Sequence, residues 1–225
     1  MLWSPNLQLH YPFENNANDF SGNARHGSIF GSGVFATRPN AGRCLYFDGT
    51  ADYVATPSFG LSGTVLVFAA DVRCILSGST IQTLVGDASQ IGGVGYIWCY
   101  RDANLNNLKW RYAYGLLGTA AHNTFFANPY NDAWLHLAVV CDYSNANTYF
   151  YRNGILLSTV AMAGAPLFPT TNRVKYVGSY NATPVSPLTL GYLRNVQLWT
   201  LAAMPAAAQM LANVNRLMMG MHPIW

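Results

Sequence analysis

The chain has 225 residues, of which 51% are hydrophobic, 14% aromatic and only 9% charged, and its formal net charge is +3 at pH 7. Ordinary soluble domains carry about 25% charged residues, so this surface must be covered by Asn, Ser, Thr and Tyr or be partly hidden against other subunits. The scattered basic residues exclude a nucleic-acid-binding patch, and no apolar stretch approaches the about 20 residues that would insert across a membrane.

Near the start of the chain, residues 14–23 read ENNANDFSGN. Asn, Asp, Ser and Gly hydrogen-bond their own backbone and accept positive φ, so this stretch predicts a turn whether or not it binds anything. Whether its acids also serve a site must be decided by the rest of the sequence.

Strand-like runs follow, separated by Gly, Asn, Pro and Ser. They lie at residues 44–49, 64–76, 94–100, 108–115, 134–143 and 148–160. This pattern predicts an all-β antiparallel sandwich, and 225 residues fit one such domain. Asn153 and Gly154 interrupt the last run and predict a tight hairpin, because a type I′ turn needs positive φ at both central residues.

Residues 204–218 predict one short C-terminal helix, with Pro205 in its first turn, which we expect to pack on a sheet edge. The cysteines Cys44, Cys74, Cys99 and Cys141 lie inside apolar runs without CxxC spacing. That placement predicts buried free thiols, with one or two disulfides as the open alternative.

A second predicted hairpin carries aromatic residues at alternate positions. Tyr96, Trp98 and Tyr100 share one face of its first strand, and Trp110, Tyr112 and Tyr114 share one face of its second. If the strands pair in register, six rings line one side of the ribbon. They then either fill the interior between two sheets or form a sugar-binding platform. The predicted binding residues are Trp98, Tyr100, Arg101, Trp110, Tyr112 and Tyr114.

Four motifs in order resemble the concanavalin A-like lectin and glucanase superfamily, specifically its laminin-G-like (LamG type 3) jelly roll. They are LHYPFENNANDFSGNARHG at 9–27, AGRCLYFDGTADYV at 41–54, WLHLAVVCDYSNANTYFYRNGILL at 134–157 and LGYLRNVQLW at 190–199. The resemblance covers nearly the whole chain. It implies a single two-sheet jelly-roll domain over residues 1–225, and it implies that residues 14–23 are a family turn.

The fold does not decide the activity, because jelly rolls host glycosidases, lectins, adhesion modules and virion proteins. Glycosidases of this superfamily carry two glutamates and an aspartate on one strand, and retaining hydrolysis needs two carboxyl groups about 5 Å apart. Here Glu14 is the single glutamate, and it lies in a turn with Asp19 as its nearest acid. His136 alternates with apolar neighbours and is interpreted as a sheet histidine. The chain is therefore predicted to be no enzyme.

Many members of the superfamily hold one calcium at the sheet edge, so the resemblance makes calcium the possible cofactor. Calcium takes six to eight oxygen ligands, and Asp19, Asp48 and Asp52 are the best candidates. In the closing strand, however, Arg194 stands where relatives carry an acid. Arg194 pairing with Asp19 or Asp48 in place of a cation is the alternative hypothesis.

Both ends of the chain are apolar, at residues 1–8 and 217–225. If exposed, these arms would form a patch that marks an interaction site; the alternative is that they fold back on their own domain. The predicted assembly residues are Trp3, Met218, Met219, Ile224 and Trp225.

Together these observations predict a non-enzymatic binding or assembly protein. The preferred hypothesis is a virion component, either a capsid decoration protein or a tail or spike adhesin, with other protein subunits and glycans as partners. The alternatives are a free-standing lectin and, remotely, a glycoside hydrolase. The N-terminus lacks the features of a signal peptide, which a virion component does not need, so the expected location is the virion or the extracellular space.

Overall fold

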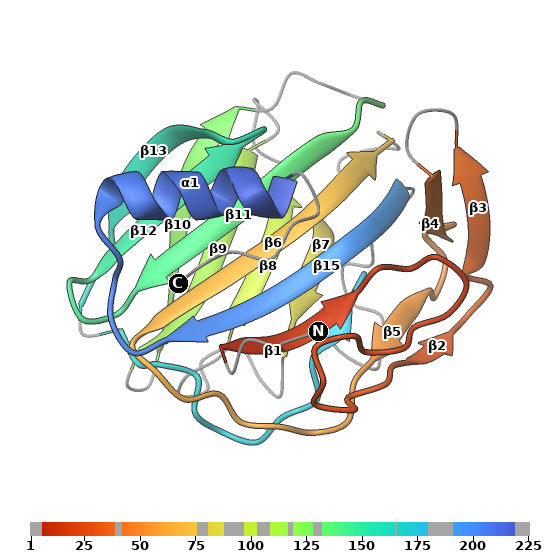
Figure 1. Cartoon of the computed structure of the whole chain (residues 1–225), viewed down its shortest axis with the longest axis horizontal. Coiled ribbons are helices and arrows are strands. Elements are labelled where there is room, and N and C mark those ends of the chain that lie inside the picture. Colours follow the sequence, from red (N-terminus) through yellow and green to blue (C-terminus); the bar gives the residue numbers. More distant parts are fainter. Residues whose placement is uncertain are drawn as a thin grey trace.

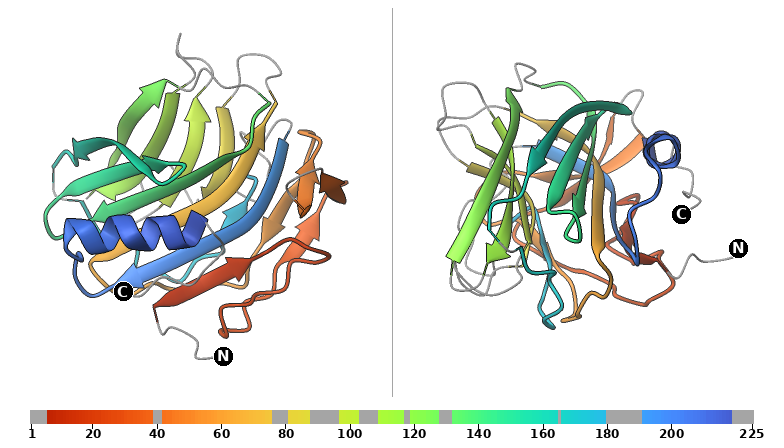
Figure 2. Two further views of the ribbon diagram at one scale, coloured as in Figure 1. Left: turned by 45° about the horizontal axis from the view of Figure 1, so that its top comes forward. Right: turned by 90° about the vertical axis from the view of Figure 1, so that its left-hand side faces the viewer.

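The computed structural model describes residues 6–38, 42–75, 81–87, 97–102, 109–116, 119–127, 132–164, 166–179 and 191–218. Two antiparallel sheets pack face to face, and one helix lies on the outer surface of the first sheet (Figures 1 and 2). The predicted all-β sandwich with a short C-terminal helix is therefore confirmed.

The first sheet has eight strands, in the order β13-β12-β11-β6-β15-β4-β3, with β1 also pairing to β15. These strands are β1 (Leu7–Tyr11), β3 (Val34–Arg38), β4 (Gly42–Phe47), β6 (Val65–Cys74), β11 (Leu135–Asp142), β12 (Asn147–Arg152), β13 (Ile155–Ala161) and β15 (Gly191–Leu201). The first and last of the described strands, β1 and β15, are thus paired with each other in one sheet.

The second sheet has seven strands, in the order β10-β9-β8-β7-β14-β5-β2. They are β2 (Ser28–Phe30), β5 (Tyr53–Ala55), β7 (Ile81–Gly86), β8 (Ile97–Asp102), β9 (Lys109–Leu116), β10 (Thr119–Ala127) and β14 (Tyr176–Val177). In the right-hand view of Figure 2 the two sheets are seen as separate layers.

Strand β6 shows why its sequence is apolar almost throughout. Its even-numbered residues, among them Leu66 and Phe68, belong to the core between the sheets. Its odd-numbered residues Val65, Val67 and Ala69 belong to a second cluster on the outer face of the sheet. Both faces of this strand are therefore buried at this end, and the alternation expected of a half-solvated strand is absent.

Helix α1 (Ala207–Met218) covers that second cluster. Met210, Val214 and Leu217 recur at helical spacing, are fully buried, and pack over β6, β11 and β15. The helix was predicted at a sheet edge; it lies on the face instead (Figure 1). The physical reason is that the outward residues of these central strands are apolar and must be covered.

Beyond the helix the same outer face becomes polar. Along β6 the outward positions change from Ala69 to Asp71 and Arg73, and on β11 His136 lies opposite Asp71. The polar residues therefore lie on the part of the face that α1 does not cover.

Two local predictions are also confirmed. Asn153 and Gly154 have φ of 49° and 77° and connect β12 to β13, as the type I′ hairpin requires. All four cysteines are buried and free. Within the described residues, no helix has the length and apolar character needed to cross a membrane.

Candidate functional site

A cleft of about 630 Å³ opens on the outer face of the first sheet, beside the C-terminal end of α1. Residues of β1, β4, β6 and β15 line it, together with the loop after β1 and the last described residue of the helix. They are His10, Pro12, Glu14, Asn15, Asn16, Phe20, Gly42, Arg43, Asp71, Arg194, Asn195 and Met218.

The cleft forms where β15 changes its neighbour. On one side β15 pairs with β6 at residues 191–194 and again at residues 197–201. On the other side it pairs with β4 at residues 191–193 and with β1 from Val196 onward. The space between the diverging β4 and β1 strands is where the cleft lies.

A β-bulge at this junction directs two adjacent side chains of β15 outward. The register with β6 shifts between Arg194 and Gln197. Leu193 and Val196 both belong to the core between the sheets, so Arg194 and Asn195 between them both lie on the outer side. Asn195 has φ of 51°, which is uncommon for a residue other than glycine. Bulges with such a backbone are frequent next to functional sites.

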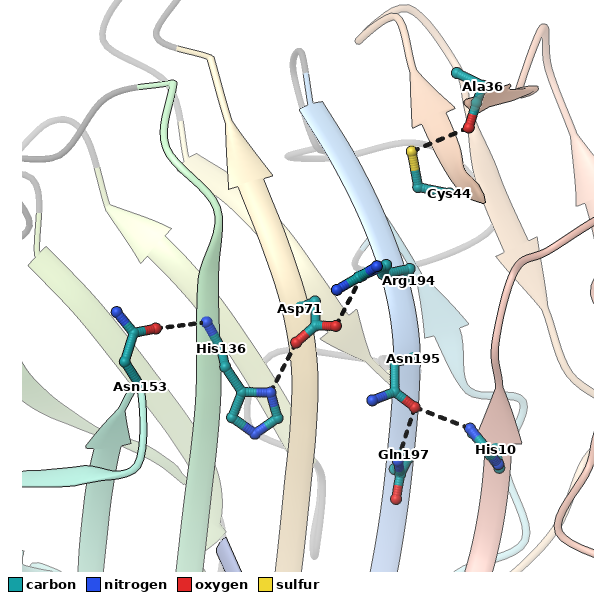
Figure 3. A network of polar contacts seen from close by, with 9 residues as sticks. All are labelled: His10, Ala36, Cys44, Asp71, His136, Asn153, Arg194, Asn195 and Gln197. Atoms are coloured by element: carbon teal, nitrogen blue, oxygen red, sulfur yellow. Dashed lines mark hydrogen bonds and ion pairs between the residues drawn. The ribbon is translucent and has the colours of Figure 1, made fainter. Parts of the chain in front are cut away.

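Asp71 is the centre of the first polar network (Figure 3). Its Oδ1 accepts a hydrogen bond from Nδ1 of His136 at 2.8 Å, and its Oδ2 accepts one from Nε of Arg194 at 2.9 Å. The side chains of Asp71 and His136 are 11% and 5% exposed, whereas that of Arg194 is 34% exposed. The remaining guanidinium nitrogens of Arg194 are therefore held at the cleft by a buried carboxylate.

Asn195 is the centre of the second network. Its Oδ1 lies 3.0 Å from Nε2 of His10 and accepts a hydrogen bond from Nε2 of Gln197 at 2.8 Å. Gln197 in turn accepts a hydrogen bond from Nε1 of the buried Trp199, which packs under α1. With Oδ1 occupied, the amide orientation of Asn195 is fixed. No described residue accepts a hydrogen bond from Nδ2 of Asn195, so this donor is available to a ligand.

The rest of the lining adds complementary chemistry. Phe20 is 48% exposed and presents an aromatic ring at the edge of the cleft. Arg43 supplies further donors, and Glu14, Asn15 and Asn16 supply acceptors. A fixed amide, guanidinium groups, acceptor oxygens and one open ring are suited to a ligand with many hydroxyl groups and an apolar face.

Asp19, the first predicted calcium ligand, is occupied by its own loop. Its Oδ1 accepts hydrogen bonds from the backbone N–H of His10 and Ser21, and its Oδ2 from the Ser21 hydroxyl and the backbone N–H of Arg25. Asp19 is 7% exposed. Residues 14–23 are thus a turn ordered around this carboxylate, and four donors already take the place of a cation.

Asp48 and Asp52 form a separate cluster around Ser32. The Ser32 hydroxyl bonds both carboxylates, and Asp52 also accepts the backbone N–H of Asp48 at 2.7 Å. The hydrogen bond from Ser32 is the main cause that lowers the pKa of Asp48. Within the described residues no three acidic, histidine or cysteine side chains gather in a manner that fits a metal ion. These carboxylates therefore do not fit a shared calcium site.

The expected partner of Arg194 was wrong. Arg194 bonds Asp71 and neither Asp19 nor Asp48, because it lies directly opposite Asp71 in the β15–β6 ladder. Directly opposed residues of antiparallel strands share a face and lie close together.

The predicted aromatic ribbon also differs from expectation. Strands β8 and β9 pair, but Tyr100 lies opposite Arg111 and Cys99 lies opposite Tyr112. The aromatic positions of β8 and β9 are therefore not directly opposed in the ladder. Tyr100 is only 1% exposed and offers no open ring. The side chains of Trp98, Arg101, Trp110, Tyr112 and Tyr114 lie outside the described part, and their binding role stays a prediction.

Of the predicted assembly residues, Trp3, Met219, Ile224 and Trp225 lie outside the described residues. Met218 is 37% exposed and lines the cleft at the end of α1. The cleft itself was missed by sequence reasoning. The available signals were Asp71 and Arg73, two charged residues inside an otherwise apolar run, and the adjacent polar pair Arg194 and Asn195 within the closing strand.

Comparison with known proteins gives one family match. The Laminin_G_3 model, described as the concanavalin A-like lectin/glucanases superfamily, matches residues 48–208. No curated protein matches the chain.

Solved structures share the fold at low identity. Domain 4 of AbnA, an extracellular GH43 arabinanase from Geobacillus stearothermophilus solved with arabinotriose, has a TM-score of 0.70 and 17% identity, with 94% of this chain and 98% of that domain covered. The receptor-binding domain of botulinum neurotoxin D has a TM-score of 0.72 and 9% identity over 96% of this chain. A structure of botulinum neurotoxin type C, whose cell entry depends on interaction with two ganglioside molecules, has a TM-score of 0.68 and 13% identity over 94% of this chain. The chain spans about half the length of the toxin structures, at 52% and 51%.

Proposed function

The chain belongs to the concanavalin A-like lectin/glucanases superfamily, and from this premise we propose that it is a non-enzymatic carbohydrate-binding domain whose binding site is the cleft between β1, β4 and β15. The observation that carries the proposal is the available Nδ2 of Asn195, fixed at the cleft by His10 and Gln197. A preorganised donor loses little freedom on binding, which favours affinity.

The other walls of the cleft support the same ligand class. The exposed ring of Phe20 suits the apolar face of a sugar, while Arg43, Arg194 and the loop asparagines suit its hydroxyl groups. Binding sites of this kind combine aromatic surface with a few placed polar groups. The arabinotriose of the AbnA domain and the gangliosides of the type C toxin indicate which sugars to test first.

The two carboxylates at the cleft support the proposal of binding without hydrolysis. Both oxygens of Asp71 accept hydrogen bonds from His136 and Arg194, and Glu14 lies in an exposed loop. A retaining glycosidase needs an acid and a nucleophile facing each other across about 5 Å. Asp71 instead uses its two oxygens to accept hydrogen bonds from His136 and Arg194.

The test is a glycan array probed with the purified chain, followed by calorimetry on the saccharide with the highest signal. The variant Phe20→Ala is expected to weaken binding about tenfold, the loss expected when an aromatic side chain that contributes more than about 1 kcal/mol to binding is removed. Phe30→Ala is the matched control, because Phe30 is 44% exposed and lies outside the cleft on β2. The proposal fails if no saccharide binds, or if both variants bind as wild type does. Release of reducing sugar from the bound saccharide would instead indicate an enzyme.

A second function, assembly with other protein subunits, is favoured by a separate apolar groove of about 360 Å³. Tyr149 and Tyr151 of β12, Leu156 of β13 and Leu211 of α1 line it, and Leu156 and Leu211 are 44% and 42% exposed. Exposed apolar surface of this kind marks interaction sites. We propose self-association through this groove, in a virion or at a cell exterior, as the form this function takes.

Light scattering after size exclusion tests the second function. We expect wild type to be oligomeric and Leu211→Glu to be monomeric with unchanged circular dichroism. A monomeric wild-type chain at high protein concentration would contradict it.

A further inference from the structure

Four side chains form a row on the outer face of the first sheet, where β6 ends and β11 and β15 begin. Tyr192 of β15 lies opposite Tyr46 of β4 and opposite Arg73 of β6. Trp134, directly before β11, completes the row. We call these four residues the Tyr192 row.

The ring of Tyr192 contacts the rings of both Tyr46 and Trp134. The ring centres of Tyr46 and Tyr192 are 4.9 Å apart, and those of Trp134 and Tyr192 are 6.3 Å apart. The guanidinium of Arg73 lies 5.6 Å from the centre of the Tyr192 ring. Tyr192 is buried between its neighbours, whereas Trp134 and Tyr46 are half-buried and so present part of their rings outward.

The row is continuous with the cleft through Arg194. This residue lines the cleft, and its guanidinium also lies 5.5 Å from the centre of the Trp134 ring. Nε of Arg194 donates a hydrogen bond to Oδ2 of Asp71, which fixes the position of its side chain. A ligand in contact with Arg194 therefore reaches both the polar cleft and the aromatic row without leaving the face of the sheet.

The two arginines at the row, Arg73 and Arg194, each form an ion pair with an aspartate of the same protein. Arg73 bonds Asp132 at 2.7 Å, and Arg194 bonds Asp71 at 2.9 Å. An anionic ligand such as a nucleic acid or an acidic glycan would have to compete with these carboxylates for the guanidinium groups. The surface is instead matched to an uncharged ligand with flat apolar faces and hydroxyl edges.

We propose that Trp134 and Tyr46 extend the cleft into a groove for a neutral linear oligosaccharide. Further sugar rings of the oligosaccharide would stack on these two aromatic residues. The ligand class is then a glycan chain longer than a disaccharide, bound along its length, and not a single terminal sugar. This inference rests on the proposed carbohydrate-binding function, because it places the first sugars in the cleft.

The experiment is a glycan array that presents neutral linear saccharides, each as a mono-, di-, tetra- and hexasaccharide, beside branched, sialylated and sulfated glycans. The wild-type signal is expected to rise with chain length in a neutral series. Trp134→Ala is expected to weaken binding of the hexasaccharide about tenfold and to leave the disaccharide signal unchanged. Phe20→Ala is expected to weaken all lengths.

Tyr46→Ala provides a second test of the row, should Trp134→Ala not fold, because Tyr46 lies at the opposite end from β11 and its removal spares the Arg194–Asp71 pair. Phe30→Ala is again the control. Length-independent binding, binding confined to branched or acidic glycans, or a hexasaccharide signal unaffected by both variants overturns the inference while leaving the proposed function standing. An array on which no saccharide binds overturns the proposed function itself.

Discussion

Replacement of Asp71 by Asn tests the network that holds Arg194 at the cleft. The change removes the negative charge and leaves one acceptor oxygen for two donors, His136 and Arg194. A hydrogen bond to a charged group contributes about 1.5–3 kcal/mol, and the buried bond to His136 is of this kind. The bond to Arg194, whose side chain is 34% exposed, is screened by solvent and contributes about 1 kcal/mol or less.

Because Asn keeps one of the two bonds, we expect Asp71→Asn to lower the free energy of unfolding by about 2 kcal/mol, and the melting temperature by about 4–8 °C for a chain of this size. The assay is urea unfolding followed by tryptophan fluorescence and by circular dichroism, whose coincidence establishes a two-state transition.

Asp132→Asn is the matched control, because it removes the same charge from the exposed pair with Arg73, whose side chains are 23% and 50% exposed. We expect Asp132→Asn to lower the free energy of unfolding by less than about 1 kcal/mol. Equal losses in the two variants, or a smaller loss for Asp71→Asn, would refute the assignment of Asp71 as the buried centre of the network.

Further predictions concern buried groups and one turn. Lys175 is fully buried against Asp87 and two backbone carbonyls. Lys175→Met should lower the free energy of unfolding by about 3–5 kcal/mol, because it leaves a buried carboxylate without its cation. Burial lowers the pKa of Lys175 in the native protein. At pH values between that lowered pKa and about 10.5, the pKa in the unfolded chain, the unfolded chain therefore binds more protons than the native protein does. The free energy of unfolding of wild type, relative to that of Lys175→Met, should therefore rise with pH in this window. Burial raises the pKa of the Cys99 thiol, and the native protein should react slowly with a thiol reagent that titrates all four cysteines in urea; an immediate native reaction would disagree with their burial. Gly154→Ala should lower the free energy of unfolding by about 1–2 kcal/mol because φ is positive there. The new Cβ would also clash with Oδ1 of Asn215, so Asn215→Ala in the same chain should restore part of the loss in an unfolding titration. Added calcium or chelator should leave the melting temperature unchanged, because the carboxylate of Asp19 already accepts four hydrogen bonds. A higher melting temperature with calcium would contradict this prediction.

The parts of the fold that local patterns specify were predictable. The Asn153–Gly154 turn depends on two adjacent residues with positive φ, and the helix depends on the 3.6-residue spacing of Met210, Val214 and Leu217. The position of the helix on the face was not predictable in the same way. It depends on which strands lie side by side, and β6, β11 and β15 come from distant parts of the chain.

The site depends on register, which a pattern in one strand does not fix. Asp71 meets Arg194 across a ladder that joins residues 123 positions apart. Between strands, a shift of one residue moves every side chain to the other face, and the pairing of Tyr100 with Arg111, instead of with an aromatic residue, is not specified by the pattern of either strand alone. The bulge at Arg194 and Asn195 changes the phase again within a single strand.

The place of β15 in the first sheet also determines when the protein can fold. This strand lies between β6 on one side and β4 and β1 on the other, yet it is synthesised after all the other strands that the structure describes. Until residues 191–201 leave the ribosome, β1 has no partner strand in the described sheet and the exposed edge of β6 is open to other chains. Folding of such non-local pairings is slow. The sheet therefore closes only after residues 191–201 have been synthesised, and a chain shortened before residue 191 should aggregate instead of forming a smaller domain.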